Sequence, residues 1–551
     1  GSASLPRRAP RANRGRAKSV ANATRTAVTR GPRRAGSHPT TMRCTFVLLV
    51  LSCCTVAVLA DDSVVNPPTG PIQGVVTPFA REFRGVPFGK AGRWEAPASP
   101  APWTTPLDAT KDGPGCPQAC VLPKKGCPPT TSEDCLLLNV FTPLPGAEER
   151  AMNGDRNGGA GGAPVMVFLH GGNCKQGYAG GPLYDGTHLV NTTGVVLVVI
   201  QYRLGMLGWL TTNTTMPANL GMQDQIQALR WVQDNIAAFG GDPSAVTVFG
   251  QSAGAVSIAT LLTVPETKGL YRAAIMESEP FGIPFRRKLA SEQWTYDVGT
   301  KYAGCPSGRP VDDCLRAMTT EQIIAAQVKA EKDVLDNAHD LFELFWPWGF
   351  TIGDAMVTAQ PLHAWQAGAV IDVPFIIGTN RDEGTPFIYE AMGKPASRLE
   401  YDVLLGVLFG VGNAITIGFE YPVPKNTTDA RPTMARATTD GLFACGTRNG
   451  TSAVIDAPHT TSKKYIYHFN KVLSFNKFVW GPNYKECYDM VCHAGELPEV
   501  FHPNATLVGT QYKPDEQVLS TAMETYWSNM ARNLDPGSAV PSAGAAPLTW
   551  P

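Results

Sequence analysis

One serine of this chain lies between two glycines at the end of an apolar stretch. The segment 246–257 reads VTVFGQSAGAVS. Its β-branched start predicts a buried strand, and the small apolar residues that follow (AVSIATLL, 255–262) are compatible with a helix. The GQSAG pentapeptide between them has the pattern G-x-S-x-G, which places a nucleophilic serine on a strand-to-helix turn. We therefore predict that Ser252 is the nucleophile of an acyl-transfer site.

The glycines beside Ser252 have a steric reason. At so sharp a turn, side chains at these positions would collide with neighbouring strands. The serine oxygen is then exposed at the carboxyl end of the strand. It also lies at a helix N-terminus, where backbone N–H groups stabilise developing negative charge. Because the pentapeptide also occurs in ordinary glycine-rich turns, the prediction depends on its place between a strand and a helix.

Acyl transfer also needs backbone donors for the negative charge that forms on the substrate oxygen. One donor is expected at Ala253, directly after the nucleophile. The others are expected in a glycine-rich turn that follows an earlier strand. The segment FLHGGNCKQG (168–177) is such a turn, and an ordinary β-turn is its alternative interpretation.

Long apolar runs indicate how these turns are supported. Apolar runs without alternation predict strands that are buried on both faces, as in a parallel sheet. Between two of them, residues 223–239 have helical spacing and end at two glycines. Strand, helix and strand in this order predict an α/β doubly wound fold. The predicted strands cover residues 164–170, 194–204, 245–250 and 372–379.

With these pieces placed, the sequence resembles the type B carboxylesterase family, the cholinesterase-like α/β-hydrolases. The resemblance runs from about Thr69 to the end of the chain. It implies an α/β-hydrolase fold with a central, mostly parallel sheet flanked by helices. The segments that carry it are SEDCLLLNVFTP (132–143), HGGN (170–173), NLGMQDQIQALRWVQDNIAAFGGDPSAVTVFGQSAG (219–254), GTNRDEGT (378–385), CHAGELPEVF (492–501) and YWSNMARNLDPG (526–537).

The resemblance also implies the roles of individual residues. It assigns Ser252 as nucleophile, Glu383 as acid and His493 as base, with oxyanion N–H groups from Gly172, Asn173 and Ala253. The residues alone give only the order nucleophile, acid, histidine along the chain. On that basis Asp382 competes with Glu383, and His502 competes with His493. The family motif decides for Glu383 and His493, and it implies no metal and no cofactor.

Three departures from the family pattern bear on specificity. Asn173 replaces the third oxyanion glycine of many relatives, and asparagine tolerates positive φ better than most residues. Gln251 stands where cholinesterases usually have a glutamate. The first disulfide loop has no tryptophan between Cys116 and Cys135 and is shorter than the lid of family lipases. The aromatic segment LFELFWPWGF (341–350) is expected either to line the acyl pocket or to pack in the core.

The N-terminal region divides into two parts. Residues 1–41 carry ten basic residues and no acidic one, and we expect them to be disordered or not native to the protein. The segment MRCTFVLLVLSCCTVAVLADD begins at Met42. Its apolar core and Val-Leu-Ala end predict a signal peptide over 42–60, cut after Ala60. Residues 61–551 would then form the hydrolase domain, and the resemblance leads us to expect a truncated C-terminus.

Charge and cysteine spacing agree with export. Without the ten basic residues of the N-terminal segment, 37 basic residues face 47 acidic ones. Such an acidic body is a poor binder of nucleic acid. Close cysteine pairs across loops suit an oxidising compartment. We expect the pairs Cys116–Cys135, Cys120–Cys127, Cys305–Cys314 and Cys487–Cys492, although the first four cysteines allow three pairings. Glycosylation sequons begin at Asn191, Asn213, Asn426, Asn449 and Asn504.

Together these observations predict a secreted serine carboxylesterase that hydrolyses small-molecule esters through an acyl-enzyme. Two other functions remain open. One is a lipase acting on long-chain lipid esters, and the other is a non-catalytic adhesion protein of the cholinesterase-like type. We expect no nucleic-acid partner and no membrane contact beyond secretion itself.

Overall fold

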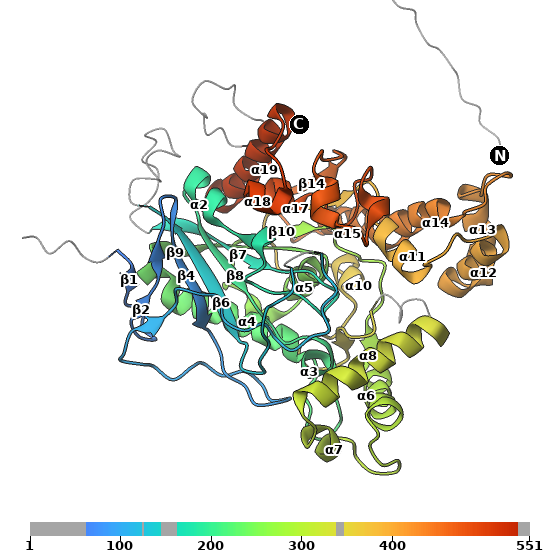
Figure 1. Ribbon diagram of the computed structural model, residues 1–551, viewed down its shortest axis with the longest axis horizontal. Helices are drawn as coiled ribbons and strands as arrows, with labels where there is room; N and C mark the ends of the chain where they lie inside the picture. The colour runs from blue at the N-terminus through green and yellow to red at the C-terminus, as the bar shows by residue number, and fades with distance from the viewer. Residues whose placement is uncertain (1–61, 124–125, 145–161, 338–345, 538–551) are drawn as a thin grey trace, which may run out of the picture. The chain divides into compact units, whose positions relative to one another are not determined.

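The computed structural model describes residues 62–123, 126–144, 162–337 and 346–537. The predicted basic segment and signal peptide lie outside these ranges. A nine-stranded sheet runs through the described body and has helices on both faces (Figure 1). The prediction of a mostly parallel sheet flanked by helices is therefore confirmed.

The strands of this sheet lie in the order β14-β13-β10-β9-β7-β8-β6-β4-β3. Neighbours from β14 to β8 are parallel, whereas β6, β4 and β3 add antiparallel strands at one edge. The strands are β3 (Val75–Val76), β4 (Ala80–Pro87), β6 (Leu137–Pro143), β7 (Ala163–Leu169), β8 (Val196–Ile200), β9 (Gly241–Gln251), β10 (Ala273–Glu277), β13 (Phe375–Asn380) and β14 (Lys464–Phe469).

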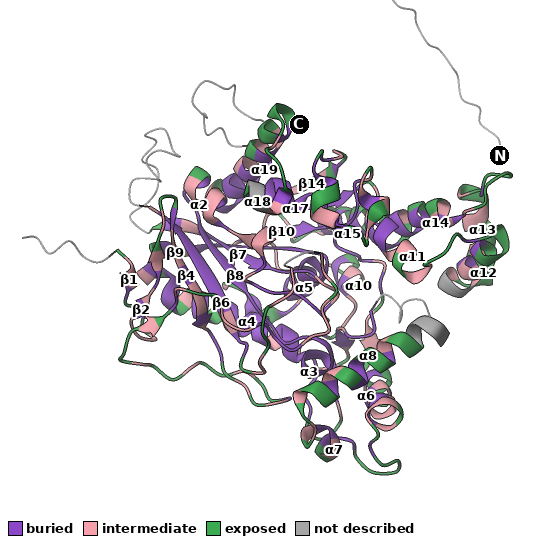
Figure 2. Cartoon of the chain, viewed as in Figure 1, coloured by how far each residue is buried: buried purple, intermediate pink, exposed green. Residues whose placement is uncertain are grey.

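The central strands are mostly apolar, and both of their faces are covered. Along β7, Val165 and Val167 join a core that also includes α4 (Leu220–Asn235) and α5 (Ala253–Leu261). Met166 and Phe168 point to the opposite face and join a second core. Helices α2 (Thr187–Thr193), α17 (Leu497–Phe501) and α19 (Pro514–Asn533) contribute to that core. Figure 2 shows the resulting buried sheet.

Other helices connect or follow the strands. They are α3 (Gly205–Trp209), α6 (Lys288–Asp297), α7 (Asp312–Arg316), α8 (Thr320–Asn337), α10 (Pro361–Gln366), α11 (Thr385–Ala391), α12 (Arg398–Phe409), α13 (Val411–Glu420), α14 (Arg431–Thr438), α15 (Cys445–Asp456), α16 (Asn476–Trp480) and α18 (Ala505–Val508). Small sheets are formed by β1 (Val64–Val65), β2 (Ile72–Gln73) and β5 (Leu107–Asp108), and by β11 (Arg286–Arg287) and β12 (Thr351–Ile352).

Four disulfides close loops on this framework, and they join the expected pairs. The bond between Cys120 and Cys127 lies inside the loop that the bond between Cys116 and Cys135 closes. The other two join Cys305 to Cys314 and Cys487 to Cys492. Of the described cysteines, the buried Cys174 and the exposed Cys445 are unpaired.

Peptide mapping of the unreduced protein should recover the nested pairs Cys116–Cys135 and Cys120–Cys127. The reason is geometric, because the Cα atoms within these pairs are 5.0 and 5.7 Å apart, within the span of a disulfide. The same digest after reduction is the control. Peptides that join Cys116 to Cys120 or Cys127 would contradict the nested arrangement.

Candidate active site

Ser252 lies at the turn where β9 ends and α5 begins. It adopts φ = 57°, which is unusual for a residue with a side chain. Its backbone N–H donates to the carbonyl of Glu277 on β10 at 2.9 Å, and its carbonyl accepts from Val256 at 2.9 Å. The strained turn is thus held by the sheet on one side and by the helix on the other. The side chain is 9% exposed, at the carboxyl edge of the sheet.

The flanking glycines are required by the neighbouring strand. A Cβ atom on Gly250 would lie 2.6 Å from the carbonyl oxygen of Leu169, at the end of β7. One on Gly254 would lie 1.9 Å from the same oxygen. The expected collision with a neighbouring strand is therefore confirmed, and it is most severe at Gly254.

Glu383 and His493 form a buried acid–base pair. The Nδ1 atom of His493 lies 2.6 Å from Oε2 of Glu383. The other carboxylate oxygen, Oε1, accepts from the backbone N–H of Asn380 at 2.6 Å. An ionised carboxylate only accepts hydrogen bonds, so Nδ1 is the donor in this contact, and in a neutral ring the lone pair then lies at Nε2. The pair therefore has the tautomer that a general base requires.

Backbone pairing brings the two loops of this pair together. The N–H of Asp382 donates to the carbonyl of Val491 at 3.0 Å, and the N–H of Val491 donates to Oδ2 of Asp382 at 2.8 Å. Asp382, the competing acid, thus joins the loops, and Glu383 faces the imidazole. The competing base, His502, instead bonds Ser520 Oγ through Nδ1 at 2.7 Å.

Gly172 and Asn173 lie on the turn after β7, with φ of 110° and 58°. Their backbone N–H groups have no acceptor among the described residues. Ala253 is the first residue of α5, so its N–H has no acceptor within the helix. Gly172 and Asn173 line the same cavity as Ser252, which is the arrangement that the oxyanion prediction requires.

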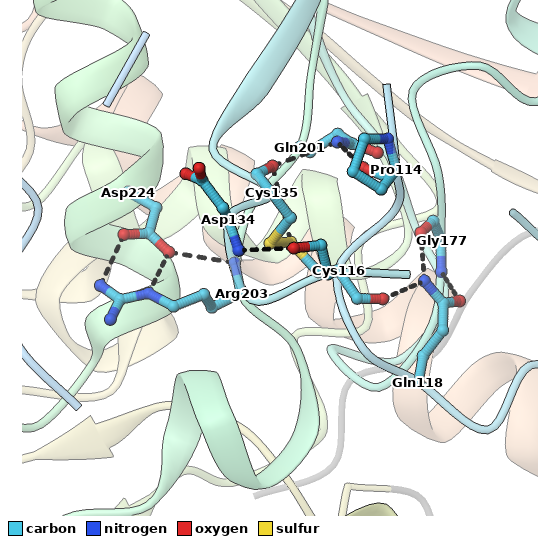
Figure 3. Close-up of a disulfide and its surroundings, with 10 residues drawn as sticks. Pro114, Cys116, Gln118, Asp134, Cys135, Gly177, Gln201, Arg203 and Asp224 are labelled. Carbon is cyan, nitrogen blue, oxygen red and sulfur yellow. Dashed lines mark hydrogen bonds and ion pairs between the residues drawn. A yellow bond between two sulfur atoms is a disulfide. The ribbon is translucent and has the colours of Figure 1, made fainter. Parts of the chain in front are cut away.

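The first disulfide loop is tied to this turn by Gln118 (Figure 3). Its amide group donates to the carbonyls of Cys116 at 3.0 Å and Gly177 at 2.8 Å, and its oxygen accepts from the N–H of Gly177 at 2.9 Å. The loop also carries Leu122, which lines the cavity. The disulfide-closed loop therefore forms part of the cavity wall and is fixed relative to the predicted oxyanion donors.

The cavity has a volume of about 250 Å³ and a mostly apolar lining. Trp480 and Tyr484, with ring centroids 5.7 Å apart, form an aromatic wall that the sequence analysis did not identify. In the aromatic segment 341–350, of which 341–345 lie outside the described ranges, Trp346 and Trp348 pack in the core. Other lining residues are Gly171, Lys175, Gln176, Tyr184, Gln251, Glu331, Phe387, Glu390, Ala391, His493 and Leu497.

Two further carboxyl groups are buried behind Glu383, and the sequence analysis missed both. Glu277 accepts from the indole N–H of Trp527 at 2.7 Å, and the side chain of Asn380 donates to Glu496. Burial raises the pKa of Glu277 to about 8. Burial, with the charges of Glu277 and Glu383, raises the pKa of Glu496. Both shifts favour the neutral carboxyl form and so disfavour a second negative charge beside Glu383.

The sheet order and the serine turn between β9 and α5 define an α/β-hydrolase. The sequence profile of the carboxylesterase family matches residues 61–551. The chain therefore belongs to the carboxylesterase family.

Several known proteins are similar to this chain. It is 34% identical to the crystal protein of Dictyostelium discoideum, over 87% of this chain and 83% of that protein. It is 31% identical to para-nitrobenzyl esterase of Bacillus subtilis (strain 168), over 89% and 92%. A solved PNB esterase structure superposes with a TM-score of 0.69 at 30% identity, covering 87% of this chain and 92% of that one. Mouse neuroligin-2 is 28% identical over 87% of this chain and 61% of its own length.

Gly254→Ala should reduce the free energy of unfolding by about 1–3 kcal/mol and abolish ester hydrolysis, because the added methyl group would displace the serine turn from β7. Thermal melting and activity on a small ester measure the two effects. Gly393→Ala is the matched control, since a Cβ there meets no described atom within 4 Å. Wild-type stability and activity in Gly254→Ala would show that the turn does not depend on this contact.

Proposed function

We propose that the protein is a serine carboxylesterase that uses Ser252, His493 and Glu383. The observation that carries this proposal is the buried hydrogen bond between Glu383 and His493, whose imidazole lines the same cavity as Ser252. Family membership and the esterases among the relatives support hydrolysis of carboxylic esters. The order of Ser252, Glu383 and His493 along the chain, which is the order of nucleophile, acid and base in this fold, also supports the proposal.

In the proposed mechanism, Ser252 Oγ attacks the ester carbonyl while His493 takes its proton at Nε2. The N–H groups of Gly172, Asn173 and Ala253 stabilise the oxyanion. Glu383 stabilises the imidazolium, which then protonates the leaving alcohol. Water attacks the acyl-enzyme with His493 again as base, and the acid product leaves. Every step uses side chains and backbone groups of this chain.

We propose small-molecule carboxylic esters as substrates, because the cavity is small and mostly apolar. A lipase acting on long-chain lipid esters is the alternative that a series of acyl chain lengths would separate. The non-catalytic adhesion protein of the sequence analysis is the second alternative, and the similarity to neuroligin-2 is the observation that favours it. That alternative predicts no turnover of any ester by the purified protein.

Ser252→Ala should reduce kcat for a small ester by roughly a million-fold, the loss seen when a comparable triad loses its nucleophile. Steady-state hydrolysis by the purified secreted protein is the measurement. Ser244→Ala, which removes an exposed hydroxyl at the other end of β9, should keep wild-type activity. Near-wild-type turnover by Ser252→Ala, with contaminating esterases excluded, would refute the mechanism.

We also propose that the protein is secreted after removal of residues 42–60. The four disulfides support an oxidising compartment, and within the described ranges no helix is long and apolar enough to cross a bilayer. Of the five sequon asparagines, Asn191 is half-buried and the others are exposed.

When expressed from Met42 in a eukaryotic host, the protein should accumulate in the medium and begin at Asp61, because the predicted cleavage follows Ala60. N-terminal sequencing of the secreted product checks this. A product that stays in the cytosol and retains Met42 would contradict the proposal.

A further inference from the structure

The base His493 is already hydrogen-bonded on the side that must receive the serine proton. Its Nε2 atom lies 3.1 Å from the side-chain nitrogen of Gln251. Within the described part of the chain, the Ser252 hydroxyl has no hydrogen-bond partner. In this structure, Nε2 of the imidazole is therefore hydrogen-bonded to Gln251, the residue directly before the nucleophile, and not to the nucleophile itself.

The position of the imidazole proton determines which group donates in this hydrogen bond. Nδ1 of His493 donates to Glu383, so the neutral ring has its only lone pair at Nε2. A carboxamide nitrogen can only donate, so Gln251 donates to that lone pair. A hydrogen bond to the neutral form of a group disfavours its charged form. Gln251 can therefore donate to Nε2 only while the imidazole is neutral, which is the form that can act as a base.

The position of Gln251 is set by buried structure. It is the last residue of β9 and is 3% exposed. Its side-chain oxygen lies against Gly171, where an added Cβ would be only 2.7 Å from Oε1. On the far side, the rings of Phe387 and Phe443 lie 5.0 and 5.1 Å from the imidazole. Gln251 is therefore directed at Nε2 by the strand behind it and the turn beside it.

We propose that Gln251 is a positioning residue for His493, an inference that rests on the proposed esterase function. Its amide holds the ring with the proton on Nδ1 and covers Nε2 until the Ser252 hydroxyl replaces it in the substrate complex. A carboxylate at this position would accept from Nε2–H and would favour the imidazolium. The neutral amide, in contrast, donates only to an unprotonated Nε2.

The other charged groups near the imidazole are bonded to other partners or are exposed. Glu383 bonds the opposite nitrogen, and burial raises the pKa of the two carboxyl groups behind it, Glu277 and Glu496. Asp382 is paired with Arg381 at 2.8 Å. Across the cavity, Lys175 lies 3.5 Å from Glu331. The remaining charged group that lines the cavity is Glu390, which is exposed.

The test compares pH profiles of kcat/KM for phenyl acetate in the full-length secreted protein. Gln251→Glu should move the acidic limb to higher pH by about one unit or more, as expected for an opposite charge beside an imidazole. Gln251→Met, which has a similar shape but neither donor nor charge, should place the limb between the other two. A merely structural role would lower activity at every pH without moving the limb.

Ala391→Glu is the control for charge, because it adds a carboxylate to the cavity lining at a position other than 251. The acidic limb of its pH profile of kcat/KM should move by less than half of the shift in Gln251→Glu. Equal shifts in these two variants, or a wild-type limb in both Gln251 variants, would overturn the proposal. Either result, combined with the loss of activity in Ser252→Ala, would leave the esterase proposal intact. Full activity in Ser252→Ala would instead remove the esterase mechanism itself.

Discussion

Parallel pairing of the strands from β14 to β8 is the constraint on which the candidate site depends. Parallel strands end at the same edge of a sheet, so the segments after β7, β9, β13 and β14 meet there. These segments carry, in turn, the predicted oxyanion turn, Ser252, Glu383 and His493. Burial of both sheet faces fixes the strands, and the close approach of Gly254 to β7 fixes the serine turn. The central sheet therefore brings together site residues that lie far apart in the chain.

The second feature of this site is the arrangement of charged and neutral groups around Glu383 and the imidazole of His493. Glu277 and Glu496 are buried behind Glu383, and burial raises the pKa of both carboxyl groups, which disfavours further negative charge there. On the other side of the imidazole, the neutral amide of Gln251 stands where related cholinesterases usually have a carboxylate. One imidazole thus faces one carboxylate at Nδ1 and a neutral donor at Nε2. In the proposed mechanism, the imidazole becomes charged when it accepts the serine proton.

The sequence predicted strands β7, β8, β9 and β13 because their apolar runs are continuous and long. It did not predict β10, whose apolar run of Ala273 to Met276 is short and lies between Arg272 and Glu277. Competition between Asp382 and Glu383 could not be decided from residue types, because it depends on backbone pairing with Val491. The contact of Gln251 with His493 joins residues 242 positions apart, so no local pattern could reveal it. The aromatic wall of Trp480 and Tyr484 was not predicted either, because its place in the cavity depends on how distant segments of the chain pack.

The most direct test of the central claim is to trap the nucleophile. The secreted protein would be treated with a fluorophosphonate ester, which phosphonylates activated serines, and digested peptides would be analysed by mass spectrometry. The account predicts one adduct per chain, on Ser252, and no adduct when His493 is replaced by alanine. An adduct on another serine, or none on Ser252 in a protein that hydrolyses esters, would contradict the account.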